Sequence, residues 1–489
     1  FSIACLIFGC ACHALWYLFF IVLVAFLGYS LYIKHIHMKY DHIPGPPRNS
    51  FFFGHTPTFL REMKAVIVCI SCYLYRAQTY GPVYRLNGLH HAMIVVSCPE
   101  ATKEILMSPK YPKDKFAYKR LFHLFGQRFL GNGMVTAVNH EQWYKQRRIM
   151  DPAFSSLYLR GLMSTFNERA ERLMDKLADF ADCKKETCML HLVNCVTLDV
   201  IAKVAFGVDL DLLKHTDSPF PKAIEVCLEG MMYHVRDAFF QLIPKNWPFV
   251  NEVRQACKLL RDTGYRWIQA RKTAIQHGEE VPKDILTQII KSADKEESMG
   301  KDDEEFMLDN FVTFFIAGQE TTANQLKPTA VNEIVQLPHN PPLPSIYLQV
   351  LKETLRLYPT APGTSREVHE DMVINGIHIP GGVTCFSSYV TSRMDKFFKD
   401  PLTFDPDRFH PDAPKPYYCY YPFSLGPRSC LGQNFAQMEA KVVMAKLLQR
   451  FEFNLVPGQS FDIRDVGTLR PKDGVMSHIK HRNHSKVNE

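Results

Sequence analysis

The chain has 489 residues, of which 46% are hydrophobic, and a formal net charge of +7 at pH 7. This apolar content supports a substantial core and excludes an intrinsically disordered chain. The basic residues are scattered, so we expect no nucleic-acid partner. A mildly basic surface suits anionic lipid or an acidic protein instead.

The N-terminal segment is strongly apolar, and its first 33 residues contain no Asp, Glu, Lys or Arg. Because about 20 apolar residues span a bilayer as a helix, residues 1–33 are predicted to form a transmembrane signal-anchor. A cleaved signal peptide is the alternative, but its apolar region is typically only about 7–15 residues long. The chain begins with phenylalanine, so we expect further residues before it.

A basic flank and a proline-rich hinge follow at residues 34–50. Lysines and histidines occupy much of 34–39, and by the positive-inside rule this flank stays cytoplasmic. Residues 43–47 read Ile-Pro-Gly-Pro-Pro, which is typical of a stiff, extended connector. Residues 51–489 are then expected to form one large cytosolic domain.

The body of the chain is predicted to be mainly helical with a small β-rich part. Segment 80–98 alternates as two short strands with a turn near Gly88, and strands return around 372–386. Between about 99 and 300 the apolar residues recur at helical spacing, as in Phe166, Ala170, Leu173 and Leu177. The charged stretch 294–305 is interpreted as a solvated loop.

Residues 306–327 form an apolar pattern that predicts a helix crossing the core. Gly318 interrupts it at a cost of roughly 1 kcal/mol relative to Ala. Next to it, Glu320 and Thr321 place an acid and an alcohol in an apolar interior, which is costly unless they are paired or functional. The alternative is a threonine that bonds to the carbonyl four residues earlier.

Two polar pairs lie at helical spacing. Glu353 and Arg356 share one face of a helix predicted over 346–358, and Trp143 and Arg147 share one face of another. Taken alone, the first is a common surface ion pair of small energetic value. The second is more often an arginine whose aliphatic stem packs against the tryptophan than a binding site.

The most specific pattern is a ten-residue run on a glycine-bounded loop before a helical pattern, with Phe423, Gly426, Arg428, Cys430 and Gly432 at its key positions. The start of a helix favours a thiolate at Cys430. One thiolate cannot build a structural zinc site, which needs four ligands, but it is a suitable axial ligand for haem iron. The glycines allow close approach of a flat macrocycle. The alternative is an ordinary buried cysteine.

This run resembles the haem-binding loop of the cytochrome P-450 (haem-thiolate) superfamily, and the likeness covers nearly everything after residue 40. The resemblance implies the P-450 fold, haem as cofactor, Cys430 as the iron ligand, and Phe423, Gly426, Arg428 and Gly432 as parts of the haem site. Arg428 is suited to a haem propionate because it forms charge-assisted hydrogen bonds.

The other motifs take roles by the same resemblance. Residues 317–321 resemble the family's oxygen-activation motif, in which Thr321 holds a water and Glu320 relays protons. Glu353 and Arg356 resemble its E-x-x-R pair, completed by Arg408, which fixes the cysteine loop. Family propionate ligands correspond to Trp143, Arg147 and Arg366, and family substrate-cavity positions to Leu130, Val135, Ile316 and Ala317.

The resemblance implies a membrane-bound monooxygenase of the endoplasmic reticulum that uses O2 and electrons from an NADPH-dependent flavoprotein reductase. Residues 42–48, 308–318, 400–408 and 421–459 most resemble sterol side-chain hydroxylases, so a sterol substrate is expected. Another lipophilic substrate, such as a fatty acid or xenobiotic, and a catalytically impaired haem-binding variant are the alternatives.

One departure from the family pattern lies between the two central motifs. Only 30 residues separate Thr322 from Glu353, where the family has two or more helices. The intervening text carries Pro328 and a proline cluster that reads as a loop. We interpret 326–345 as the site of a deletion that puts stable folding and turnover at risk.

Overall fold

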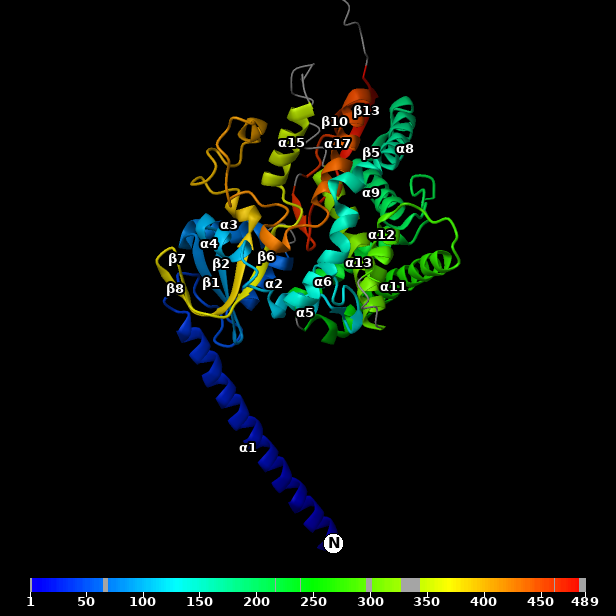
Figure 1. Ribbon diagram of the computed structural model, residues 1–489. Coiled ribbons are helices and arrows are strands. Elements are labelled where there is room, and N and C mark those ends of the chain that lie inside the picture. Colours follow the sequence, from blue (N-terminus) through cyan, green and yellow to red (C-terminus); the bar gives the residue numbers. More distant parts are fainter. Residues whose placement is uncertain are drawn as a thin grey trace, which may run out of the picture.

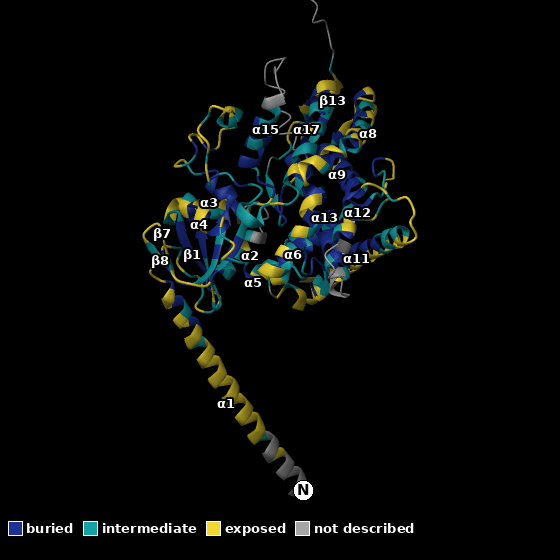
Figure 2. Ribbon diagram, viewed as in Figure 1, coloured by how far each residue is buried: buried dark blue, intermediate teal, exposed yellow. Residues whose placement is uncertain are grey.

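In the computed structural model, α1 (Ser2–Lys39) projects from a body that has a β-rich part and a larger helical part (Figure 1). The structure describes residues 2–64, 69–215, 217–237, 239–295, 301–326, 344–460 and 462–482. Most of the described side chains of α1 are exposed, whereas the helices of the body turn buried faces inward (Figure 2). The last turns of α1 join the β-rich part.

The β-rich part contains a four-stranded sheet of order β1-β2-β9-β6. Its strands are β1 (Val83–Gly88), β2 (His91–Val96), β6 (Gly363–Val368) and β9 (Gly382–Ser387). Between β6 and β9 in the chain, β7 (Met372–Ile374) and β8 (Ile377–Ile379) form a separate two-stranded hairpin. Only the β2–β9 pairing is parallel. The predicted hairpin at 80–98 is confirmed, and its turn places Leu89 at φ +52°. The sequence did not predict β6.

Short strand pairs connect segments of the helical part. They are β3 (His123–Leu124) with β4 (Gln127–Arg128), β5 (Glu186–Cys188) with β13 (Met476–His481), β10 (Phe451–Leu455) with β13, and β11 (Ile463–Asp465) with β12 (Leu469–Pro471). The pairing of β5 with β13 joins two segments that are far apart in the sequence. The C-terminal strand therefore packs against the middle of the chain.

Helices make up the rest of the body. Two helices precede β1 in the chain: α2 (Thr56–Lys64) and α3 (Cys69–Tyr80). Between β2 and β6 lie α4 (Pro99–Leu106), α5 (Lys115–Arg120), α6 (His140–Met150), α7 (Ser156–Arg160), α8 (Met163–Asp182), α9 (Met189–Phe206), α10 (Phe220–Arg236), α11 (Trp247–Gln276), α12 (Ile285–Lys295), α13 (Lys301–Gln325) and α15 (Pro344–Leu357). After β9 come α16 (Ser388–Thr391) and α17 (Gln433–Arg450). The mainly helical body with a small β-rich part was predicted.

The core is built around α13, which packs against α9, α11 and α17. Nearly every described residue from Met307 to Ile316 is buried, as the apolar pattern predicted. Gly318 faces α9, where an added Cβ would lie 2.8 Å from Ile201. The glycine is therefore the residue that lets these two helices meet closely.

Two expectations about element boundaries were wrong. Residues 301–305 begin α13 instead of continuing the charged loop, because acidic residues are favourable in the first turn of a helix. Residues 34–39 continue α1, so the helix passes beyond the predicted anchor, and His37 is buried against the body. The expected deletion site at 326–345 lies largely outside the described residues, apart from Leu326 and the start of α15.

Candidate active site

The cysteine loop turns sharply before α17. Cys430 donates its backbone N–H to the Phe423 carbonyl at 2.8 Å, and Gly432 is the N-cap residue of α17. Gly426 adopts φ +67°, and a Cβ there would collide with the Leu106 carbonyl. Gly426 therefore lets the loop approach α4, which differs from the expected approach to a macrocycle.

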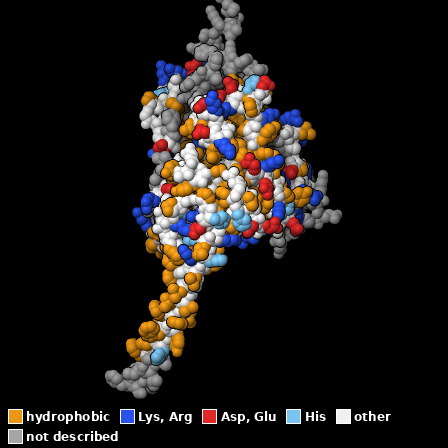
Figure 3. Space-filling view, turned by 90° about the vertical axis from the view of Figure 1, so that its left-hand side faces the viewer, with side chains coloured by type: hydrophobic (Ala, Val, Ile, Leu, Met, Phe, Trp, Pro, Cys, Tyr) orange, Lys and Arg blue, Asp and Glu red, His pale blue; other side chains and the backbone are white. Residues whose placement is uncertain are grey.

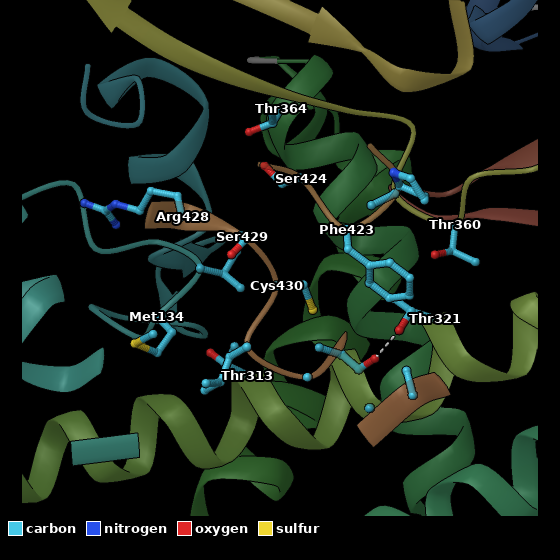
Figure 4. Close-up of a pocket in the computed structure, with 18 of the residues that line it drawn as sticks. Met134, Thr313, Thr321, Thr360, Thr364, Phe423, Ser424, Arg428, Ser429 and Cys430 are labelled. Carbon is cyan, nitrogen blue, oxygen red and sulfur yellow. Dashed lines mark hydrogen bonds between the residues drawn. The ribbon is translucent and has the colours of Figure 1, made fainter. Parts of the chain in front are cut away.

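A cavity of about 360 Å³ opens in front of this loop. The Cys430 sulfur points into it and faces the stretch of α13 that carries Thr313 and Thr321 (Figure 4). Its apolar lining includes Met134, Val135, Phe154, Ile201, Phe314 and Ala317. The site thus offers one thiol opposite a helix, in a largely apolar space.

Burial raises the pKa of the Cys430 thiol, and this effect outweighs the Gly432 backbone N–H and the charges of Arg147 and Lys113, which lower it. The start of α17 therefore lowers the pKa of the thiol without offsetting the effect of burial. A metal cation at the sulfur reverses this balance, because a coordinating thiol is deprotonated.

Glu320 and Thr321 are neighbours in sequence but face different cavities. Thr321 lines the cysteine cavity and donates its hydroxyl to the Ala317 carbonyl at 2.6 Å (Figure 4), the back-bonded arrangement weighed as the alternative. Glu320 is buried and accepts hydrogen bonds from Asn324 and Thr468 at 3.0 and 3.2 Å. Its carboxylate lines a separate, more polar cavity between α9, α10 and α13.

A cluster of cations lies at one end of the cysteine cavity, with Arg366 buried and Arg428 and Lys113 half-buried. Burial lowers the pKa of Arg428 to about 10, and burial also lowers the pKa values of Arg366 and Lys113. One Nη atom of Arg366 and one of Arg428 are buried without a hydrogen-bond partner. The nearby carboxylate of Asp114 is already used by Ala117 and Ser365. The cluster can therefore receive additional negative charge.

Trp143 and Arg147 both line the cavity from α6. The Arg428 guanidinium lies over the Trp143 ring, 4.2 Å from its centre. Arg147 donates to the Ser429 carbonyl at 2.8 Å, directly beside the cysteine. The Trp143 and Arg147 pair predicted from the sequence thus contacts the cysteine loop at two adjacent residues, Arg428 and Ser429.

The buried carboxylate of Glu353 joins α15 to the loop that precedes the cysteine. Arg356 donates to it through Nε and Nη2 at 2.7 and 2.8 Å, and both side chains are 0% exposed. Arg408 lies 3.4 Å away as a second cation, and the Asp405 backbone N–H donates at 2.8 Å. This bidentate geometry is specific to a planar guanidinium.

The structure does not bring every predicted site residue to the cavity. Leu130 and Ile316 are packed in the main core, while Val135 and Ala317 line the cavity. Arg366 stands behind the wall, on β6. The sequence analysis missed Lys113 and Tyr118, which both line the cavity. No motif marks either residue, and the only signal was their place in a basic, aromatic stretch.

Together these features define a haem-thiolate site. A single cysteine faces an apolar space, and one buried donor without a partner belongs to Arg428 in the cavity wall and another to Arg366 behind it. The donors fit the two propionates of haem, since charge-assisted bonds would satisfy the unpartnered Arg366 and Arg428 atoms. Lys113 is placed to contribute a further charge.

The comparisons with known proteins agree with this class. A family model described as Cytochrome P450 matches residues 44–332 and 346–480. Human Cytochrome P450 4F2 is 29% identical over 83% of this chain and 84% of its own length, and human Cytochrome P450 3A7 is 28% identical over 84% and 85%. The 11-oxo-beta-amyrin 30-oxidase of Glycyrrhiza uralensis is 28% identical over 78% and 77%.

The chain belongs to the cytochrome P450 family. Its cofactor is accordingly haem, iron protoporphyrin IX, and its activity is that of a P450 monooxygenase. Haem bound through a thiolate supplies the activation of O2 that lets one oxygen atom enter a C–H bond. Members of the family take electrons from redox-partner reductases and bind a lipophilic substrate.

Proposed function

We propose that this P450 is a membrane-anchored sterol hydroxylase whose substrate is cholesterol, hydroxylated on its side chain at C24. The observation that carries the proposal is the largely apolar cavity in which Thr321 faces Cys430. Such a cavity suits a large hydrocarbon with few polar groups. The choice of a sterol is supported by the resemblance of residues 42–48, 308–318, 400–408 and 421–459 to cholesterol 24-hydroxylase.

The relatives support a lipophilic substrate in general terms. One of them, by its name, oxidises 11-oxo-beta-amyrin. The others carry names that state no substrate. A fatty acid or a xenobiotic is therefore the competing substrate class for the same cavity.

Within this proposal each site residue has a stated task. Cys430 is the iron ligand, and Arg428, Arg366, Trp143, Arg147 and Lys113 hold the propionate edge. Thr321 holds a water that delivers protons. Glu320, which faces the second cavity, takes up protons on the far side of α13. Glu353, Arg356 and Arg408 fix the cysteine loop.

The proposed location is the endoplasmic reticulum membrane, with the body in the cytosol and an NADPH-dependent flavoprotein reductase as electron donor. Of the described helices, Cys12–Lys39 and Met189–Phe206 are long and apolar enough to cross a membrane, but the second is mostly buried in the core. Hydrophobic side chains run along the visible face of α1 (Figure 3). This exposed helix is the proposed single span, with residues 1–33 as the anchor.

Substrate titration tests the proposal. Cholesterol added to the haem-loaded protein should move the haem spectrum toward the high-spin form, because a bound sterol excludes water from the cavity. Turnover with NADPH and the reductase should then give the 24-hydroxylated product. Lauric acid is the comparison ligand. A spectral change with lauric acid and none with cholesterol would transfer the assignment to fatty acids.

An impaired haem-binding variant is the second candidate. The match to the family model is interrupted between residues 332 and 346, at the site where the sequence is short. Inserting a segment of family length between Gln325 and Ile346 should raise the haem content per polypeptide, since additional packed helices would cover the core. Equal haem content and equal thermal stability of both forms would show that the short segment is tolerated.

A further inference from the structure

A tight turn at residues 131–137, called here the 131–137 turn, links β4 to α6 and lies against α13. Two glycines let it approach the helix: Gly131 adopts φ +49°, and a Cβ added to it would collide with the Asp309 carboxylate. A Cβ at Gly133 would lie 2.7 Å from the Thr313 hydroxyl. The turn is therefore seated on one face of α13.

The Asp309 carboxylate is the centre of this contact. It is 0% exposed and accepts four hydrogen bonds: two from Arg128 at 3.0 and 2.7 Å, one from Arg261 at 2.7 Å, and one from the Asn132 backbone N–H at 2.8 Å. Arg128 belongs to β4 and Arg261 to α11. One carboxylate thus joins three separate elements and the turn.

The next residue extends the same attachment. Asn310 accepts the Met134 backbone N–H at 2.8 Å and donates to Gln146 of α6 at 2.7 Å. Gln146 in turn donates to the Asn132 carbonyl at 2.9 Å. The backbone of the turn is therefore held at Asn132 and Met134, so its position against α13 is tightly defined.

The opposite side of the turn forms part of the active site. Met134 and Val135 line the cysteine cavity. The Val135 carbonyl accepts from Lys113 at 2.7 Å, and the Ala137 carbonyl accepts from Arg428 at 2.6 Å. The turn consequently connects Asp309, which lies outside the cavity lining, to two wall side chains and two cations of the haem site.

We propose that Asp309 is a positioning residue that sets the shape of the substrate side of the cavity by fixing the 131–137 turn. Its carboxylate lies outside the cavity lining, and its hydrogen bond to the Asn132 backbone N–H connects it to the turn that carries the wall residues Met134 and Val135. The inference applies to any lipophilic substrate of this P450 and does not depend on the choice of a sterol. A purely structural ion-pair network is the competing explanation, because breaking a buried pair is destabilising in itself.

Two nitrogen ligands of haem separate these explanations. Imidazole is small and needs only the space at the iron, whereas clotrimazole also needs the cavity walls. In the haem-loaded full chain, Asp309→Asn should raise the Kd of clotrimazole by about ten-fold and change the Kd of imidazole by less than about two-fold. Amide hydrogen exchange should become faster in residues 131–137. Equal weakening of both ligands, or unchanged clotrimazole binding, would overturn the proposal.

Asp199→Asn is the matched control. Asp199 is also a buried carboxylate on a long helix, it accepts the Leu212 backbone N–H at 2.9 Å, and it does not line the cavity. It should leave the ratio of the two Kd values unchanged. A similar change of that ratio in the control would mean that any buried carboxylate has this effect.

Gly131→Ala tests the proposal with every charge retained, in case Asp309→Asn folds poorly. The added methyl group displaces the turn from the carboxylate, so the same selective loss of clotrimazole binding is expected. Combined with Asp309→Asn, its effect should be less than additive, because both changes act through the same contact. Unchanged binding of both ligands by Gly131→Ala would refute the role of the turn.

Discussion

Thr321 and Glu320 illustrate how far neighbours in sequence can differ in function. Consecutive residues of a helix point about 100° apart, so Thr321 faces the cysteine cavity and Glu320 a polar cavity behind α13. The motif predicted that both residues matter, but adjacency in sequence does not tell which space a side chain enters. That depends on how α13 is rotated within the core.

Replacing Thr321 with Ala should separate electron use from product formation. The fold should be retained, because the hydroxyl bonds only to the Ala317 carbonyl of its own helix. Loss of positioned proton delivery should lower the rate of product formation by about 10²-fold, with hydrogen peroxide released instead. The measurement is NADPH consumed, peroxide and product in one assay.

Thr79→Ala is the control for this prediction, since the exposed Thr79 makes the same type of bond to the Tyr75 carbonyl on α3. It should leave the coupling unchanged. If Thr321→Ala also kept full coupling, the proton-delivery role of Thr321 would be wrong.

Cys430→Ser should abolish the carbon-monoxide difference spectrum typical of a thiolate-bound haem, because a neutral hydroxyl does not replace the thiolate's electron donation. Cys419→Ser is the matched variant: Cys419 is buried in the same part of the chain but does not line the cavity. It should keep the spectrum. The reverse pattern would move the ligand assignment to Cys419.

Strands with a clear apolar alternation in the sequence were predicted, and strands without one were not. The hairpin of β1 and β2 alternates and turns at Gly88, and it formed as predicted. Strand β6 reads Gly-Thr-Ser-Arg-Glu-Val, which lacks an apolar alternation, and it becomes a strand because β9 pairs with it. Tertiary pairing of this kind is not visible in a single segment.

The Glu353 carboxylate, together with Arg356 and Arg408, fixes α15 against the loop that precedes the cysteine. Glu353→Gln should weaken this attachment strongly. The variant leaves Arg356 buried with the negative charge of its partner removed, so we expect the free energy of unfolding to fall by about 3–5 kcal/mol. Haem should also be lost more readily, since the Asp405 backbone depends on the same carboxylate. Denaturant unfolding and haem retention measure the two effects.

Arg408→Gln provides the graded comparison. Its side chain is 13% exposed and lies 3.4 Å from Glu353, so its loss should cost about 1 kcal/mol, as for a partly solvated ion pair. A cost equal to that of Glu353→Gln would contradict this expectation, because the contact with Arg408 would then be worth as much as the whole carboxylate.

For the whole molecule, the junction between α1 and the body is the feature that the sequence located least well. The absence of charged residues predicted an anchor up to residue 33, but the helix continues to Lys39. Three apolar side chains at this junction are buried: Ile33, Tyr40 and Ile43. Hydropathy alone does not separate side chains that meet lipid from those that meet protein. The end of the lipid-facing part is defined by contacts with the body: α1 packs against β2, and Tyr40 donates its hydroxyl to the Gly381 carbonyl.

Two truncations should divide these roles. Removing residues 1–32 takes away the exposed part of α1, so membrane attachment should weaken while the thermal stability of the body is kept. Removing residues 1–43 also deletes the buried apolar side chains Ile33, Tyr40 and Ile43, each contributing about 1.5–3 kcal/mol, and should destabilise the body. Membrane fractionation and denaturant unfolding distinguish the outcomes. Equal stability of both truncations would contradict the observed packing.

The attachment of Asp309 also fixes the rotational phase of α13. Arg128, Arg261 and Asn132 bind the face of the helix that carries Asp309. Thr321 lies about three turns further along. One residue inserted between Phe311 and Gly318 would leave that attachment intact yet rotate Thr321 by about 100° away from Cys430. The number of residues between the two positions is therefore as strictly constrained as their identities.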